Sequence, residues 1–395
     1  MYPVWRRLLV GFQTAGILVF LGIVSLVISL MVPIKEWRTG ELPAEPLPLH
    51  PAEPFATPPI KVWIDTDAAC GQDRRTDPDD CFAILLLAQQ DTVDIVGVST
   101  VFGNAPLRET DRTTRDLINL LGKSRPHAIP VYPGASEPLN REESISTVPQ
   151  QEAHKALRKA LEEIPLVIVA LGPLTNIAIA LKDRPQLQAN VTRLVTVMGR
   201  RKGHVFHPVE GGTAHSFLGH GPVFRDFNVA EDEEAATLVV SMGLPMTLVP
   251  YEAARSVTVN STTLVHLAGH GEAAEWVAQQ ARPWLTYWRE DIGRDGFYPF
   301  DLIAAAYVAE PSLLRCTDLP IIVQDDEWLF GWLGFRGLFI VTDDQSRART
   351  YATGSALYCP KVSEQFADRL LNSAQGWLLS ADEKPMALGQ PMAAR

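Results

Sequence analysis

Four carboxylates mark the part of the chain whose residue types could do chemistry. In residues 62–90, VWIDTDAACGQDRRTDPDDCFAILLLAQQ, an apolar run ends with Asp65 and Asp67. A second apolar run begins with Asp79 and Asp80. One aspartate at a helix start is explained as an N-cap, but four converging carboxylates would repel one another unless a cation lies among them. Since oxygen ligands of this kind suit Ca²⁺ or Mg²⁺, the segment predicts a metal site.

The elements that must position these groups follow from the hydrophobic pattern. The expected strands lie at 61–65, 93–103, 164–173, 192–199 and 244–250, and the expected helices at 80–90, 106–122, 151–163, 174–182, 231–242, 262–281 and 301–309. Apolar strands that alternate with amphipathic helices are typical of a parallel sheet covered on both faces. The predicted fold class is therefore α/β, with a mostly parallel, doubly wound sheet. Ligands bind beyond the carboxyl ends of such strands, and polar residues follow each expected strand here.

The N-terminal part is expected to lie outside this globule. Residues 8–34 carry no charge, and about 20 apolar residues span a bilayer as a helix. The stretch is longer than the apolar core of a secretory signal. We therefore expect a short tail (1–7), a transmembrane helix (8–34) that anchors the protein in a membrane, and a Pro-rich linker (35–59). A folded body (60–380), on the periplasmic or extracellular side, and a flexible C-terminal tail (381–395) would follow.

The composition limits the partners. The chain has 395 residues and a formal net charge of −11. An acidic chain without a long Lys/Arg run is not expected to attract the phosphates of nucleic acid. A small molecule or a metal is the expected partner. The four cysteines lack metal-binding spacing. Two interpretations stay open for Cys70, Cys81, Cys316 and Cys359: a bridge within each neighbouring pair, or free buried thiols.

The order of the motifs resembles the inosine-uridine-preferring nucleoside hydrolase family, over roughly residues 60–310. Any one motif is weak, but five in the correct order are specific. They are Asp65, Asp67, Asp79 and Asp80, which correspond to the family's D-x-D-x-x-x-D-D with a longer spacer, then Gly103-Asn104, ALGPLTNIAIAL (170–181), VMGR (197–200), and DFNVAEDEEAA (226–236) with FDLIAA (300–305). The resemblance implies a Rossmann-like nucleoside hydrolase fold. It also implies hydrolysis of the N-glycosidic bond of ribonucleosides to ribose and free base.

The same resemblance implies a set of metal ligands. One Ca²⁺ would be held by Asp67, Asp80 and Asp301, together with a backbone carbonyl. Leu171 is the candidate for that carbonyl, and Thr175 is the alternative. Asp67 would also act as the general base, taking a proton from the water that attacks the ribose.

Substrate contacts are implied as well. Asp79 would bind the ribose 2′-hydroxyl, while Asp65 would orient the metal ligands from behind. The remaining substrate-binding candidates are Asn104, Met198, His220, Asp226, Asn228 and Phe300. The expected partners are a small nucleoside and, through the N-terminal helix, a membrane. A homo-oligomer is compatible with the sequence.

The chain departs from the family pattern at several positions. Residues 68–78 make an enlarged loop between the two aspartate pairs, Asp226 replaces a glutamate, and His220 replaces an asparagine. Phe300 stands where many members carry a histidine that acts as acid toward the leaving base. An aromatic residue there is a feature of purine-preferring members, so Phe300 slightly favours a purine. The missing histidine also supports an alternative: a non-catalytic riboside-binding or sensing module.

An aromatic cluster precedes Phe300 in the sequence. Its other members are Trp284, Tyr287, Trp288, Phe297 and Tyr298. Flat rings of this kind could bind a base, but we expect at least half of them to serve ordinary core packing.

Overall fold

The computed structural model describes residues 17–24, 26, 47–55, 59–123, 127–140, 149–201, 226–325, 336–341 and 349–371. The chain divides into two compact units, Met1–Leu47 and Pro48–Arg395. In the first unit the described residues 17–24 are helical and mostly exposed. Within the described ranges, no helix is both long and apolar enough to cross a membrane.

This finding contradicts two expectations. The transmembrane anchor over 8–34, and the periplasmic or extracellular location deduced from it, were wrong predictions, because the helix that they require is not found among the described residues. Most of 8–34 and the whole predicted tail, 381–395, lie outside those residues.

The second unit is built on one mixed sheet. Its strands are β1 (His50–Pro51), β2 (Ile60–Thr66), β3 (Val93–Thr100), β4 (Val131–Pro133), β5 (Leu166–Ala170), β6 (Val191–Thr196), β7 (Arg200–Arg201), β8 (Met246–Leu248), β9 (Leu314–Asp325), β10 (Arg336–Ile340) and β11 (Thr350–Val362). Their order is β4-β3-β2-β5-β6-β8-β11-β9-β10-β7, and β1 pairs with β9. All neighbours from β4 to β11 are parallel. β9 is antiparallel to β11, β10 and β1.

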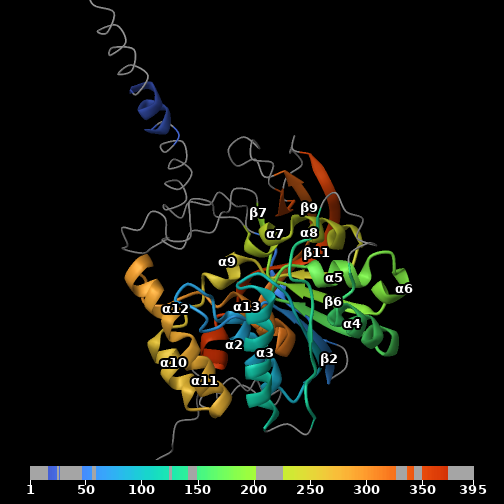
Figure 1. Ribbon diagram of the computed structural model, residues 1–395, viewed down its shortest axis with the longest axis horizontal. Coiled ribbons are helices and arrows are strands. Elements are labelled where there is room, and N and C mark those ends of the chain that lie inside the picture. The colour runs from blue at the N-terminus through green and yellow to red at the C-terminus, as the bar shows by residue number, and fades with distance from the viewer. Residues whose placement is uncertain are drawn as a thin grey trace, which may run out of the picture. The chain divides into compact units, whose positions relative to one another are not determined.

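Helices cover this sheet on both sides (Figure 1). They are α2 (Asp79–Gln89), α3 (Leu107–Gly122), α4 (Glu152–Glu163), α5 (Thr175–Leu181), α6 (Pro185–Gln188), α7 (Phe227–Glu231), α8 (Glu233–Ser241), α9 (Tyr251–Ala254), α10 (Ser261–Ala268), α11 (Glu272–Gln280), α12 (Arg282–Tyr287) and α13 (Phe300–Ala309), with the short turns η2 (Trp288–Ile292), η3 (Pro311–Leu313) and η5 (Ala367–Leu371). α2 packs with α13 and α3, and α5 packs with α4 and α8. The single helix predicted over 262–281 is two helices, because Gly269 ends α10 and Gly271, with φ +103°, precedes α11.

Part of the predicted linker belongs to the folded body. β1 pairs with β9, Ala52 is buried, and its N–H donates to the Leu314 carbonyl. The Phe55 ring lies edge-on to the Tyr307 ring, with centroids 5.8 Å apart. The packed body therefore starts before residue 60.

Both cysteine pairs form bridges. Cys70 is joined to Cys81 across the enlarged loop, and Cys316 of β9 is joined to Cys359 of β11. The bridge interpretation therefore holds over free thiols for all four.

Candidate active site

The carboxyl ends of four neighbouring strands meet at one edge of the sheet. These strands, β3, β2, β5 and β6, are parallel and adjacent. The chain adds β3 and β4 on one side of β2 and then β5 and β6 on its other side. Such a switch point leaves a crevice beyond the strand ends. Asp67, Asn104, Leu171 and Met198 each follow one of these strands, as the sequence pattern predicts.

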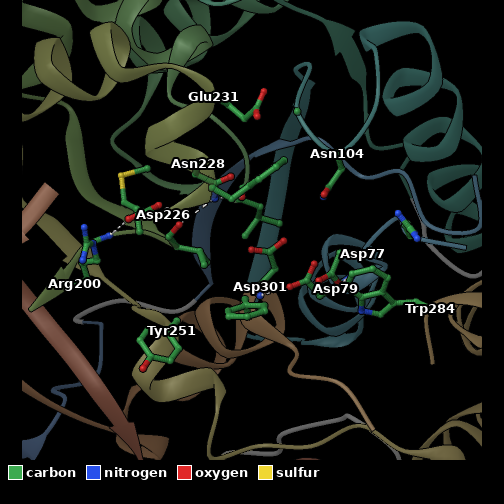
Figure 2. Close-up of a pocket in the computed structure, with 18 residues that line it drawn as sticks. Asp77, Asp79, Asn104, Arg200, Asp226, Asn228, Glu231, Tyr251, Trp284 and Asp301 are labelled. Carbon is green, nitrogen blue, oxygen red and sulfur yellow. Dashed lines mark hydrogen bonds between the residues drawn. The ribbon is translucent and has the colours of Figure 1, made fainter. Parts of the chain in front are cut away.

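A cavity of about 480 Å³ lies at this edge (Figure 2). Of the predicted site residues, those that line it are Asp79, Asn104, Leu171, Met198, Asp226, Asn228, Phe300 and Asp301. Asp67 and Asp80 are not in the wall, and both are buried, at 1% and 0% exposure. Asp65 does not line the cavity either. His220 lies outside the described residues.

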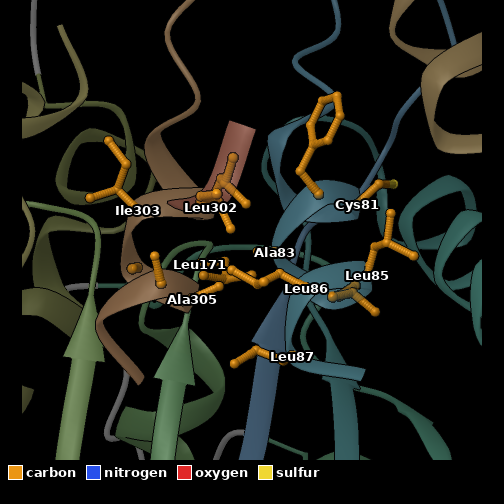
Figure 3. Packing of buried hydrophobic residues seen from close by; sticks show 14 of the residues in the cluster. Cys81, Ala83, Leu85, Leu86, Leu87, Leu171, Leu302, Ile303 and Ala305 are labelled. Carbon is orange, nitrogen blue, oxygen red and sulfur yellow. The ribbon is translucent and has the colours of Figure 1, made fainter. Parts of the chain in front are cut away.

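Two packed helices bring three carboxylates together. α2 and α13 lie side by side, with Leu86 of α2 and Leu302 of α13 among their buried residues (Figure 3). α2 is apolar around most of its circumference, so its first turn is buried with the rest of the helix. Carboxylate oxygens of Asp79, Asp80 and Asp301, all buried, lie within 4.8 Å of one another, and the Asp301 N–H donates to Asp79 Oδ2 over 3.0 Å.

Asn104 connects this group with Asp67. The Asn104 backbone N–H donates to Asp67 Oδ2 over 2.8 Å, and its side-chain amide donates to Asp80 Oδ2 over 3.2 Å. The other Asp80 oxygen, Oδ1, accepts from the Thr66 hydroxyl. Gly103 has φ +152°, and a Cβ at this position would collide with the Asp67 carboxylate. The backbone therefore approaches Asp67 as closely as only a glycine allows.

Burial and mutual repulsion oppose ionisation of the cluster. Burial raises the pKa of Asp80 to about 7, with a further contribution from the charge of Asp79. Burial, followed by the charge of Asp80, raises the pKa of Asp67 well above its usual range. Burial, followed by the charge of Asp79, does the same to the pKa of Asp301. These carboxylates therefore need a positive counter-charge to be ionised together.

The donor set fits a divalent cation. Asp79, Asp80 and Asp301 supply convergent carboxylate oxygens, and hard oxygen ligands are what Ca²⁺ and Mg²⁺ prefer. Of the predicted ligands, Asp80 and Asp301 are in this group, while Asp67 is linked to it through Asn104. The Leu171 carbonyl, the predicted backbone ligand, accepts from the Asn228 side-chain amide over 2.7 Å.

The start of α7 forms the wall of the cavity opposite Asp79, the far wall (Figure 2). Asp226 caps this helix by accepting from the Val229 N–H, and its other oxygen accepts from the Gly199 N–H over 2.5 Å. Burial raises the pKa of Asp226 to about 6 against the lowering effect of these N–H donors and of Arg200. Asn228 is held by the carbonyls of Leu171 and Val197.

Asp65 is supported from behind the site. Its Oδ1 accepts from the Ser99 hydroxyl and, over 2.8 Å, from the Asn176 amide. The Asn176 carbonyl oxygen in turn lies 2.9 Å from His154 Nε2. Because the Gln151 N–H donates to His154 Nδ1, Nε2 carries the proton of the neutral ring. Asp65 thus belongs to a buried polar network rather than to the cavity wall.

Several lining residues were not among the predicted site residues. They are Arg75, Asp77, Arg200, Phe227, Glu231, Tyr251 and Trp284. Arg75 and Asp77 lie in the enlarged loop, which the sequence predicts at the mouth of the site, but the sequence does not indicate which side chains of the loop face the cavity. Of the aromatic cluster only Trp284 and Phe300 line the cavity. Tyr287, Trp288, Phe297 and Tyr298 are buried core residues.

A family model described as inosine-uridine preferring nucleoside hydrolase matches residues 62–355. The match covers more than half of the chain, and the chain therefore belongs to this family of hydrolases acting on N-glycosyl bonds. It is 27% identical over 276 residues to uridine nucleosidase 1 of Arabidopsis thaliana, covering 64% of this chain and 75% of that protein. It is 28% identical over 258 residues to the pyrimidine-specific ribonucleoside hydrolase RihA of Shewanella woodyi, covering 60% and 77%.

Solved structures share the fold. A plant nucleoside hydrolase superposes with a TM-score of 0.58 at 21% identity, covering 76% of this chain and 94% of that one. A purine-preferring ribonucleoside hydrolase from Gardnerella vaginalis gives a TM-score of 0.57 at 19% identity, covering 78% and 96%. At these identities the likeness supports the nucleoside hydrolase fold, a mixed α/β sheet with helices.

Proposed function

We propose that this protein hydrolyses ribonucleosides with the help of Ca²⁺ and with Asp67 as the general base. The observation that carries the proposal is the convergence of buried carboxylates beside a cavity of about 480 Å³, at the carboxyl ends of parallel strands. A cation held there would neutralise the carboxylates and lower the pKa of a coordinated water. Asp80 and Asp301 are the proposed carboxylate ligands beside Asp67, and the Leu171 carbonyl is the proposed backbone ligand.

The protein's own groups have separate roles in this proposal. Asp67 accepts the proton of the attacking water, and its carboxylate is oriented by the Asn104 N–H. Asp79 binds the ribose 2′-hydroxyl. Asp226 and Asn228, on the far wall with Met198, bind the rest of the sugar. Because bond cleavage passes through an oxocarbenium-like state, the surrounding carboxylates stabilise the positive charge that develops on the ribose.

A purine is the slightly favoured leaving group. Phe300 and Trp284 both line the cavity, and two aromatic faces stabilise a larger flat ring more than a smaller one. Relatives named for uridine or pyrimidine substrates make the base preference a question for measurement.

Release of free ribose from a panel of nucleosides, with Ca²⁺ or with a chelator, tests the proposal. We expect turnover with Ca²⁺, its loss on chelation, and higher kcat/KM for inosine and guanosine than for uridine. Tight nucleoside binding without any turnover would instead identify a riboside-binding module.

A further inference from the structure

The enlarged loop between β2 and α2 is a fixed part of the cavity wall. Cys70 and Cys81 close it covalently. Gln72 Nε2 donates to Thr113 Oγ1 of α3 over 2.8 Å. Arg74 pairs with Glu290 and Asp291 at 2.5 and 2.7 Å. A loop held at three points presents its remaining side chains in defined positions, and two of these, Arg75 and Asp77, line the cavity.

The two adjacent arginines of this loop have different surroundings. Arg74 is engaged by two carboxylates outside the cavity wall. Arg75 lines the cavity, and its guanidinium carbon lies 5.4 Å from the centroid of the Tyr287 ring. Within the described ranges, no carboxylate is in ion-pair contact with Arg75. A ring face holds a guanidinium without occupying its N–H donors, so those donors are available to a molecule in the cavity.

Arg75 lies near Trp284, because its guanidinium is over the Tyr287 ring, which stacks on the Trp284 ring with centroids 5.2 Å apart. This is the end of the cavity where a nucleobase would lie. In a ribonucleoside the base is bonded to C1′, whose neighbour C2′ carries the 2′-hydroxyl. If Asp79 binds that hydroxyl, the base lies beside Asp79. Asp77 Oδ1 accepts from the Asp79 N–H over 3.2 Å, and Asp77, Asp79 and Trp284 lie on one side of the cavity (Figure 2). Asp226 and Arg200 lie on the opposite side (Figure 2), which leaves them to the other end of the sugar.

We propose that Arg75 is a catalytic residue that stabilises the departing base, in the place of the histidine that Phe300 replaces. The inference rests on the proposed function. As the C1′–N bond breaks, its electron pair moves to the base nitrogen, and the guanidinium N–H groups donate to the ring nitrogen or oxo oxygen that carries the growing negative charge. The water oxygen bonds to C1′ and gives its proton to Asp67, and the released base anion takes a proton from solvent. The guanidinium stays protonated throughout, so Arg75 acts by charge and not as an acid.

The test compares two leaving groups in the full-length protein with Ca²⁺. Inosine has a poor leaving group, whereas 4-nitrophenyl β-D-ribofuranoside has one that leaves without assistance. We expect Arg75→Gln to lower kcat for inosine ~100-fold and kcat for the aryl riboside far less. Arg75→Lys should recover part of the inosine activity, because it restores the charge but not the planar donors.

The controls separate this role from a structural one. Arg108→Gln removes an exposed arginine of α3 that pairs with Glu109, and it should leave both activities near wild type. The Ca²⁺-induced shift in the melting temperature should be the same in Arg75→Gln and wild type. Equal losses on both substrates, or no loss on inosine, would overturn the role of Arg75. A wild-type protein that cleaves neither substrate would overturn the proposed function and this inference with it.

Discussion

Asp67 is buried, and a backbone N–H holds its carboxylate. Its carboxylate accepts from the Asn104 N–H, and the backbone of Gly103 lies so close to it that a Cβ there would collide with it. A general base contributes about 10²–10⁴-fold to the rate, so Asp67→Asn should lower kcat by ~10³-fold while far-UV circular dichroism is unchanged. Asp94→Asn, which breaks a part-exposed ion pair with Lys61, is the matched control. If Asp67→Asn kept more than a tenth of the activity, Asp67 would not be the base.

Asp226 should give substrate binding a pH dependence. Burial raises its pKa to about 6, so Asp226 is protonated below that pH and ionised above it. The ionised form accepts stronger hydrogen bonds from sugar hydroxyls, and we therefore expect KM to fall as the pH rises through about 6. The measurement is KM for inosine between pH 5 and 8.

Asp226→Asn serves to assign this step in KM. The amide does not titrate, so the variant should have a raised KM without the step near pH 6. Glu272→Gln, which removes an exposed acid paired with Lys123, should keep it. The same step in Asp226→Asn as in wild type would show that another group titrates.

At the scale of elements, the Cys70–Cys81 bridge joins the enlarged loop to the first turn of α2. Replacing both cysteines by serine should lower the free energy of unfolding in urea by about 2–4 kcal/mol, because the unfolded chain regains entropy. It should also raise KM, since Arg75 and Asp79 are then held less firmly. The double serine variant of Cys316 and Cys359, which do not line the cavity, should lose stability with KM unchanged. An unchanged KM in the first variant would show that the other anchors of the loop suffice.

His154 connects α4 to the network behind Asp65, and it should make stability depend on pH. Burial lowers its pKa to about 4, below the value of about 6.5 in an unfolded chain. The unfolded state therefore binds the proton more tightly. The contribution of neutral His154 is complete above about pH 6.5 and is lost as the pH falls toward 4. It amounts to up to about 3 kcal/mol.

The difference in unfolding free energy between wild type and His154→Gln isolates this effect from the carboxylates, which are common to both proteins. We expect that difference to shrink between pH 7 and pH 4.5. His127→Gln, at an exposed position, should show no such change. A difference that stayed constant with pH would mean that His154 does not titrate on unfolding.

Elements with a strong hydrophobic pattern could be predicted from the sequence. Elements whose position depends on packing between distant segments could not. The strands at the site and most helices lie close to their predicted ranges, because each is an apolar run that ends at a polar or glycine residue. β9 and β11 alternate buried and exposed residues beside a short β10, and their antiparallel pairing depends on contacts between distant segments. The motifs indicated Asp79, Asp80 and Asp301, whose convergence the structure describes. The position of Arg75 at the cavity had no counterpart in any pattern, since it depends on how the enlarged loop is anchored.

At the scale of the whole molecule, buried acids make the fold sensitive to a cation. Burial and the charges of neighbouring aspartates raise the pKa of Asp67, Asp80 and Asp301. A ligand that binds only the folded state stabilises it by about 2.7 kcal/mol at a hundredfold excess over Kd. We therefore expect Ca²⁺ to raise the melting temperature above that of chelator-treated protein, and Mg²⁺ to do so less, because it demands a stricter octahedral geometry.

Asp301→Asn decides whether this stabilisation arises at the proposed site. The substitution removes one buried charge, so the chelator-treated variant should be as stable as wild type or more so, since less repulsion remains. Its response to Ca²⁺ should nevertheless be much smaller, because the ion has lost an anionic ligand. Asp318→Asn, on β9 and outside the cavity lining, should respond to Ca²⁺ as wild type does. A full Ca²⁺ response in Asp301→Asn would place the ion elsewhere and leave the carboxylate cluster without its proposed counter-charge.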